Sequence, residues 1–342
     1  MCELRRALGR GGAGCKLPPL EDSSFVMPES SSDLDVGELH ALLPEAYLPP
    51  LGEPDVSEMA VYGAMYGVSL PSGDPIELAP GVELRSTYAH VFSPPMVAFA
   101  PPPVPHAPHP APWHATLNGG LAETCTVEIS LDAQPLTFSL SRFDIVRLIA
   151  GLIRLLSVTP VRVSVLGDTP FSEVAQAGRA PRIWQLEVIS NWEPAVVTLD
   201  QKFVSVLRPL LEPASVLLGD DDVYRSFQLL DAVWWLPTLG AQMMAIWSAA
   251  ETMMRPGRVR TGEELAHAIR AYVGRNRSDG DRTYNEVVRL YRSRGGAAHA
   301  GHSPRADDVR ASFLVVREIF LRAFMETKRP PQPSEIVPLW KA

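Results

Sequence analysis

Residues 283–301 read TYNEVVRLYRSRGGAAHAG, and this stretch indicates how the C-terminal third of the chain folds. Its bulky side chains are spaced i, i+3, i+4 and i+7, as on one face of an α-helix: Tyr284, Val287, Val288 and Tyr291. We therefore predict a helix over about 282–294. Two glycines follow at positions 295 and 296, and because adjacent glycines weaken a helix, we expect it to end there.

Four further helices are predicted around this one. Apolar periodicity favours helices over 221–236 and 239–254. A third helix opens near Thr261 and Glu264, which have the spacing of a capping box. A last helix opens with Ser303 as its cap and Pro304 in its first turn. Its predicted apolar face consists of Val309, Phe313, Val316, Phe320 and Phe324. Five helices with short connections predict an all-α bundle over residues 219–330.

The preceding part of the chain has a mixed pattern. Strand-like alternation occurs in residues 82–92, 124–131, 161–166 and 183–189. One amphipathic helix is predicted over 142–158, with Arg147 and Arg154 sharing one face. Its core positions would be Val146, Ile149, Ile153 and Leu156. We therefore predict the α+β class, with a mixed α+β domain at 57–218 followed by the helical bundle.

Three segments have compositions that disfavour regular secondary structure. Residues 1–56 are rich in Gly, Ser, Pro and acidic residues and are predicted to form a flexible acidic tail, and 331–342 a C-terminal tail. Residues 93–114 combine many prolines with three histidines: His106, His109 and His114. Metal ligands are usually held on rigid elements beside thiols or acids, so we expect a proline-rich loop here and neither a metal nor a cofactor.

Composition also bears on the membrane and the compartment. Residues 232–250 contain no charged side chain over a length that approaches a bilayer span. Pro237 interrupts this stretch and no basic cluster precedes it, so two buried helices meeting at 236–237 are favoured over a membrane segment. The first residues lack a long apolar run, so we expect no secretory signal. Three cysteines without a C-x-x-C pair favour a reducing compartment such as the cytoplasm.

Charge is distributed unevenly. The formal net charge of -8 argues against a protein that coats nucleic acid without specificity. Residues 251–330 nevertheless hold 16 basic and 10 acidic side chains, a net of +6, so the remainder, with 15 basic and 29 acidic, has a net of -14. We expect the acidic remainder to cover the basic face of this segment and to hold its activity in check.

Arg294 and His299 form an R-x4-H pattern at the expected end of the helix, where both side chains would project from one end of the bundle. Histidine exchanges a proton near neutral pH, and a guanidinium binds phosphate through several donors. Together they suffice for metal-independent cleavage of RNA, in which a ribose 2′-OH attacks its own phosphodiester. The alternative is that His299 caps the helix and Arg294 is solvated.

Residues 245–301 resemble the HEPN superfamily, particularly its Apea-like group. In that group a helix with a buried acid precedes the motif lY-x-x-R-x-x-x-x-H-G. Glu251 matches the acid, Leu290 and Tyr291 the pair before the motif, and Arg294 and His299 the motif itself. Gly301 lies one place later than the usual glycine. The resemblance covers roughly residues 221–326.

The resemblance implies a helical bundle that forms a homodimer in which the two R-x4-6-H motifs build one ribonuclease site. His299 would be the acid-base residue and Arg294 the phosphate anchor. Many members act in bacterial toxin–antitoxin pairs or antiviral defence, where a protein partner or inhibitor controls them. Other members lack catalysis and serve as RNA-binding, protein-binding or assembly modules, which is the alternative function for this chain.

Two assignments within the motif stay open. Active members often have a polar residue after the arginine, whereas Gly295 follows Arg294. In the alternative R-x6-H register, Arg292 pairs with His299 and Ser293 supplies the polar residue. Glu251 is either a catalytic acid or a buried structural partner of an arginine such as Arg294. We expect the structural partner, because an unpaired buried carboxylate is costly.

Overall fold

The computed structural model describes residues 60–71, 73–93, 96–99, 114–117, 121–132, 138, 140–174, 182–183, 192, 195–254, 262–274, 276–299 and 303–331. For 90–93, 96–99, 114–117, 121–123, 182–183 and 297–299 it describes the backbone alone. All of them belong to one compact unit, Pro49–Ala342. The tails predicted at 1–56 and, after Pro331, at 332–342 lie outside the described residues.

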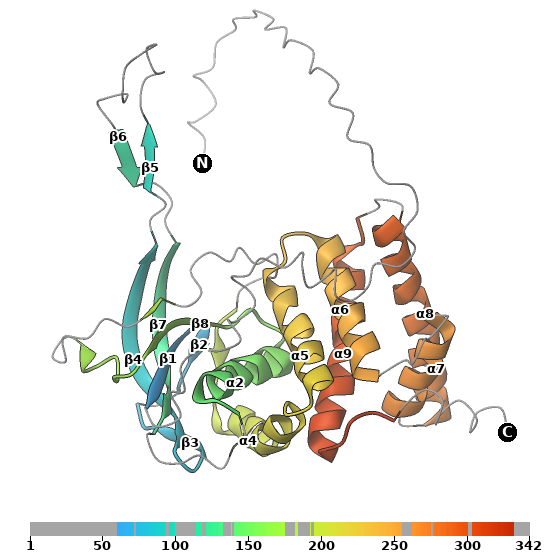
Figure 1. The fold of residues 1–342 in the computed structure, drawn as a ribbon, viewed down its shortest axis with the longest axis horizontal. Helices are drawn as coiled ribbons and strands as arrows, with labels where there is room; N and C mark the ends of the chain where they lie inside the picture. The colour runs from blue at the N-terminus through green and yellow to red at the C-terminus, as the bar shows by residue number, and fades with distance from the viewer. Residues whose placement is uncertain are drawn as a thin grey trace, which may run out of the picture. The chain divides into compact units, whose positions relative to one another are not determined.

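A six-stranded antiparallel sheet forms the β part, in the order β3-β4-β7-β1-β8-β9 (Figure 1). Its strands are β1 (Val61–Tyr66), β3 (Ile76–Ala79), β4 (Val82–Ser93), β7 (Leu121–Leu131), β8 (Arg162–Gly167) and β9 (Arg182–Ile183). The strands predicted at 82–92, 124–131 and 161–166 are confirmed. Of the strand predicted at 183–189, only Ile183 is described, and it ends β9.

Two short pairs complete the β structure. β2 (Val68–Ser69) pairs in parallel with β10 (Val197–Thr198). β5 (Met96–Phe99) pairs with β6 (His114–Leu117) in an antiparallel hairpin. The proline-rich stretch 93–114, predicted as a loop, therefore contributes β5 and the first residue of β6, while His106 and His109 lie outside the described residues.

Helix α2 (Arg142–Ser157) packs against the sheet, and its N-cap Ser141 accepts the backbone N–H of Asp144. Gly63 of β1 permits close contact, since an added Cβ would lie 2.8 Å from Val146 Cγ1. Arg147 and Arg154 share one face of α2, as predicted, but the expectation that this face lies apart from the core is wrong for Arg154. Arg154 is buried, donates to the Val161 carbonyl, and forms a 2.6 Å ion pair with Asp231.

The other helices are α4 (Gln201–Leu217), α5 (Asp221–Ala232), the 3-10 helix η2 (Val233–Trp235), α6 (Leu239–Met254), α7 (Gly262–Val273), α8 (Arg277–His299) and α9 (Ala306–Glu326). Helix α6 packs on α5, α8 and α9, and α7 packs on α8 (Figure 1). The chain is therefore of mixed α and β class, as predicted. The predicted apolar face of α9 is buried, from Val309 to Phe324.

The break between η2 and α6 falls at 236–238, where the sequence predicts two buried helices to meet. None of the described helices is both long enough and apolar enough to span a membrane.

Two predicted helix boundaries are wrong, and one helix of the structure was not predicted. Helix α8 continues through both glycines to His299, so the end predicted at 295–296 is wrong. Ser303 is not the cap of α9, because the N-cap position is Arg305 and its side chain makes no capping hydrogen bond. Helix α4 was not predicted, since Pro209 and Pro213 lie within it.

Candidate functional site at the end of helix α8

Three of the predicted site residues meet between α6 and α8. The Tyr291 hydroxyl donates a 2.5 Å hydrogen bond to Glu251 Oε1 and accepts one of 2.7 Å from Arg294 Nη1. Arg294 also forms an ion pair with Glu251, with 3.1 Å between Nη1 and Oε1 and 3.4 Å between Nη2 and Oε2. The pairing of Glu251 with Arg294, favoured from the sequence, is therefore present.

Packing fixes the ring of Tyr291. Trp247, fully buried one turn before Glu251 on α6, meets this ring edge-on at 5.3 Å between centroids. The Arg294 guanidinium lies over the ring, 5.0 Å from its centre. Burial, followed by the hydrogen bond to Glu251, raises the pKa of Tyr291 to about 12. Tyr291 is therefore a neutral hydrogen-bond donor throughout the physiological pH range.

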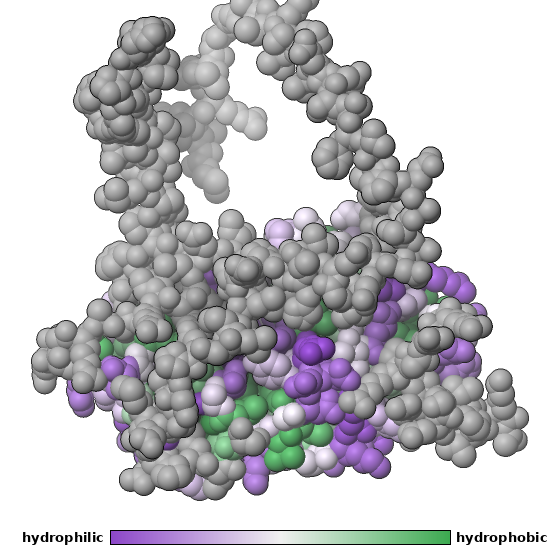
Figure 2. All heavy atoms as spheres, viewed as in Figure 1, coloured by the Kyte–Doolittle hydropathy of each residue, from purple (hydrophilic) through white to green (hydrophobic). Residues whose placement is uncertain are grey.

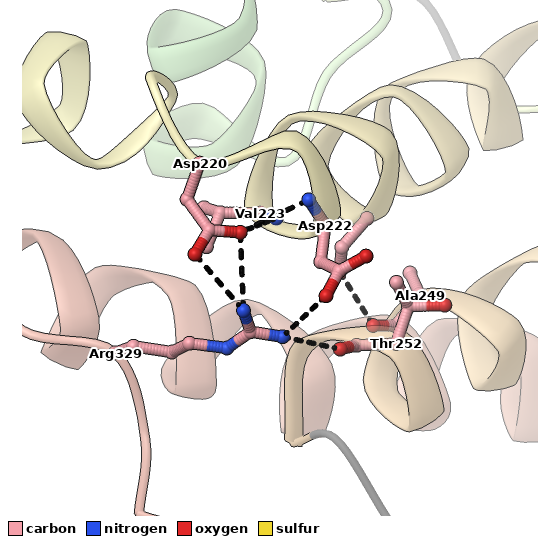
Figure 3. Close-up of polar contacts among 7 residues, drawn as sticks. Asp220, Asp222, Val223, Ala249, Thr252 and Arg329 are labelled. Atoms are coloured by element: carbon pink, nitrogen blue, oxygen red, sulfur yellow. Dashed lines mark hydrogen bonds and ion pairs between the residues drawn. The ribbon is translucent and has the colours of Figure 1, made fainter.

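The α6 segment that bears Glu251 is held by contacts on both sides of this residue. Arg329, which follows α9, donates to the backbone carbonyl of Thr252 and pairs with Asp220 and Asp222 at the start of α5 (Figure 3). Ser226 donates a 2.5 Å hydrogen bond to the carbonyl of Ala249. Glu251 thus projects from a backbone that α5 and the end of α9 both restrain.

Ion pairs join the first two thirds of helix α8 to α7 and α9. Arg270 of α7 pairs with Asp281 near the start of α8, and Arg289 pairs with Asp308 of α9 at 2.6 Å. At Gly295 and Gly296, which are half-buried, an added Cβ would meet no described atom within 4 Å. Among the described residues, α8 therefore has room for a methyl group at both positions.

The continuous helix decides how the candidate motif residues are arranged. With 3.6 residues per turn, position 299 lies about 140° around the helix axis from position 294, but about 20° from position 292. Arg292 is exposed and has no partner among the described residues. Ser293 is half-buried and lies outside the cluster of Glu251, Tyr291 and Arg294. The backbone therefore places the R-x6-H pair, not the R-x4-H pair, on one face of α8.

Two further residues that pack against the ring of Tyr291 were not identified as site residues from the sequence. Trp247 precedes Glu251 by four positions on a predicted helix, so the i, i+4 rule already placed the two on one face. Gly262, at the start of α7, lies so close to Tyr291 that an added Cβ would be 2.4 Å from the ring. No local pattern in the sequence signals that approach.

Among the described residues, no group of three or more His, Cys, Asp or Glu side chains is arranged to hold a metal ion. Comparisons with protein-family models, with curated proteins and with solved structures found no match to this chain.

Proposed function

We propose that this chain is a metal-independent endoribonuclease whose site lies on the last two turns of α8. The observation that carries the proposal is the exposed Arg292, which has no partner among the described residues and lies on the same face of α8 as position 299. A guanidinium that has no partner in the described part of the chain, two turns from a histidine position on the same helix face, offers a phosphate anchor beside a proton-transfer group. In this proposal α5 to α9 form the HEPN-like bundle that the sequence resembles.

In the proposed reaction, His299 takes the proton from a ribose 2′-OH as that oxygen attacks the adjacent phosphorus. The bond from phosphorus to the 5′-oxygen breaks, and a protonated histidine supplies the leaving oxygen with its proton. Arg292 binds the phosphoryl oxygens on which negative charge develops. The products are a 2′,3′-cyclic phosphate and a 5′-hydroxyl, and the balance requires no further reactant.

Arg294 has a different role in this proposal from that implied by the R-x4-H register. Its charge is balanced by Glu251, and its Nη1 also donates to Tyr291. Binding RNA phosphate through this guanidinium would require it to leave that carboxylate. Arg294 is therefore proposed as a positioning residue that fixes the last turns of α8, with Arg292 as the residue that touches phosphate.

A second protomer completes the proposed site. The face of α8 around position 299 includes half-buried Val288 and half-buried Gly295, where an added Cβ would meet no described atom within 4 Å. Such a surface suits close approach of the same helix from another copy, which would supply the second histidine. By resemblance the protein would act in the cytoplasm in bacterial defence or as a toxin, restrained by its acidic remainder or by a protein inhibitor.

A non-catalytic RNA- or protein-binding module is the second candidate. The observation that favours it is the neutralised Arg294, because a motif arginine bound to Glu251 is not free to act on phosphate. In this alternative the open end of α8 is an assembly surface.

The test compares wild type with His299→Ala, Arg292→Ala and Arg294→Ala on a short fluorescent RNA and on total RNA, with EDTA present. Arg310→Ala, an exposed arginine on α9, is the matched control. We expect cleavage to 2′,3′-cyclic ends, lost by about 10²-fold or more in His299→Ala and in Arg292→Ala and unchanged in Arg310→Ala. Arg294→Ala should lower both activity and melting temperature.

Cleavage that persists in His299→Ala prepared in the same way would reject the nuclease proposal. RNA binding without cleavage in every variant, at a salt-dependent affinity, would favour the binding module instead.

A further inference from the structure

Helix α4 carries a row of apolar side chains that the fold leaves uncovered. Val206 and Val216 are 50% and 56% exposed, and exposed Pro209 and half-buried Pro213 lie between them on the same side of the helix. The opposite side of α4 is buried against the rest of the fold through Val204, Leu207, Leu210, Leu211 and Ala214. Figure 2 shows apolar side chains gathered in the lower middle of the view, where Figure 1 places α4.

Helix stability does not explain this row. Valine is a weaker helix former than Ala, Glu or Lys, and proline within a helix costs about 3 kcal/mol. Both residue types lose little side-chain entropy on burial, because the proline ring is fixed and valine is stiff at χ1. The valines and prolines of the row therefore weaken a helix that is exposed to water, but lose little side-chain entropy when another surface covers them.

The spacing of the row reads the same from both ends: Val206-x2-Pro209-x3-Pro213-x2-Val216. Two copies of α4 that run antiparallel about a two-fold axis would place each valine opposite the other valine of the second copy. Pro209 would in the same way meet Pro213. An interface between identical chains about a two-fold axis must be complementary to itself, and this spacing meets that requirement.

The charges at the ends of the row follow the same symmetry. Exposed Lys202 lies four residues before Val206, and exposed Asp221 lies five residues after Val216. In the antiparallel arrangement, each Lys202 approaches the turn of the other copy that carries Asp221, in which Asp220 is already paired with Arg329. It also approaches the C-terminal end of that copy's α4, where the helix dipole is negative.

We propose that α4 is a self-association helix, which binds the α4 of a second copy antiparallel across a two-fold axis. This contact is separate from the end of α8 and does not depend on the proposed nuclease activity.

Disulfide trapping tests the register. In a full-length chain with Cys2→Ser and Cys15→Ser, and with Cys125 buried, Val206→Cys and Val216→Cys are introduced together and singly. The two positions are about 15 Å apart along one helix, too far for a disulfide within one chain. We expect oxidation to give a covalent dimer in the double variant and little in either single variant. Equal trapping in the single variants, or none in the double variant, would overturn the proposal.

Sedimentation velocity at several protein concentrations tests the contact without oxidation. Val216→Glu should weaken self-association about tenfold or more, because each copy would bury a charge against an apolar row. Val196→Glu is the matched control, since Val196 is 70% exposed and lies outside α4, and it should leave association unchanged. Association unaffected by Val216→Glu would reject the proposal. Binding of phosphatidylcholine–phosphatidylserine vesicles that Val216→Glu abolishes, without dimer trapping, would assign the row to a membrane surface instead.

Discussion

The Tyr291 hydroxyl donates a 2.5 Å hydrogen bond to Glu251, a residue 40 positions earlier in the chain. This bond joins α8 to α6 just before the glycine pair, and Arg294 adds an ion pair to the same carboxylate. The orientation of the last turns of α8, and with it the direction of the proposed site, depends on this link. Because 25% of the Glu251 side chain is exposed, a substitution at this position can test the link without placing a new group in the core.

Glu251→Gln should destabilise the fold more than it alters chemistry. The amide oxygen still accepts from Tyr291, but the charge that balances Arg294 is lost. Because the pair is only partly buried, we expect a loss of about 1–2 kcal/mol in the free energy of unfolding. Urea denaturation measures this loss, with Glu263→Gln on the exposed side of α7 as the control. An unchanged melting temperature in Glu251→Gln would show that the carboxylate has no structural role.

The raised pKa of Tyr291 predicts a loss of stability in alkali. The pKa rises from 10.0 to about 12, chiefly through burial, so the unfolded chain releases this proton first. The stabilisation is complete below about pH 10 and is lost as the pH rises toward 12. Between about pH 8 and pH 11, wild type should lose about 1 kcal/mol more than Tyr291→Phe does.

Denaturation of both proteins at the two pH values checks this difference, with Tyr88→Phe, at an exposed tyrosine, as the control. Identical pH slopes for wild type and Tyr291→Phe would contradict it.

Gly262→Ala should disturb the cluster from a third helix. The added Cβ would lie 2.4 Å from Tyr291 Cδ1, so the ring must move and the bond to Glu251 must lengthen. We expect a loss of about 1–3 kcal/mol. Gly240→Ala on α6 is the matched control, because its Cβ would meet no described atom within 4 Å and alanine favours the helix. Equal melting temperatures for the two variants would show that the contact with Tyr291 is not close.

The sequence predicted the elements whose local pattern and tertiary environment agree. Helix α6 has the predicted bounds, 239–254, because an apolar stretch follows the Pro237 break and is buried on most sides. The alternation in β4, β7 and β8 was sufficient to predict these strands, and α2 packs on the part of the sheet formed by β1 and β8.

Elements in which packing overrides local preference were missed. Helix α4 includes two prolines that normally end a helix, yet its buried face from Val204 to Ala214 holds it against the fold. The glycine pair predicted an end to α8, but Ala297 and Ala298, which are good helix formers, follow it and the helix continues.

Of the candidate site, only the ion pair between Glu251 and Arg294 could be predicted from the sequence. An acid that is expected to be buried requires a cation, and this reasoning connected Glu251 to Arg294 before any geometry was known, although the structure leaves 25% of the Glu251 side chain exposed. It did not reveal that Tyr291 lies between them, nor that Gly262 makes room for the ring. Both facts depend on how three helices meet, which no short-range pattern records.

Replacing both Gly295 and Gly296 with alanine separates stability from function at the open end of α8. Neither Cβ would meet a described atom within 4 Å, and alanine is favoured over glycine inside a helix by about 1 kcal/mol. The double variant should therefore be about 1–2 kcal/mol more stable than wild type, as measured by urea denaturation. If a second copy or RNA approaches α8 closely at these positions, the two methyl groups will obstruct it, and RNA cleavage or binding should fall although the fold is stabilised. A variant that is more stable and equally active would show that the glycines serve no close approach, and a variant that is less stable would show that α8 does not continue as a helix through them.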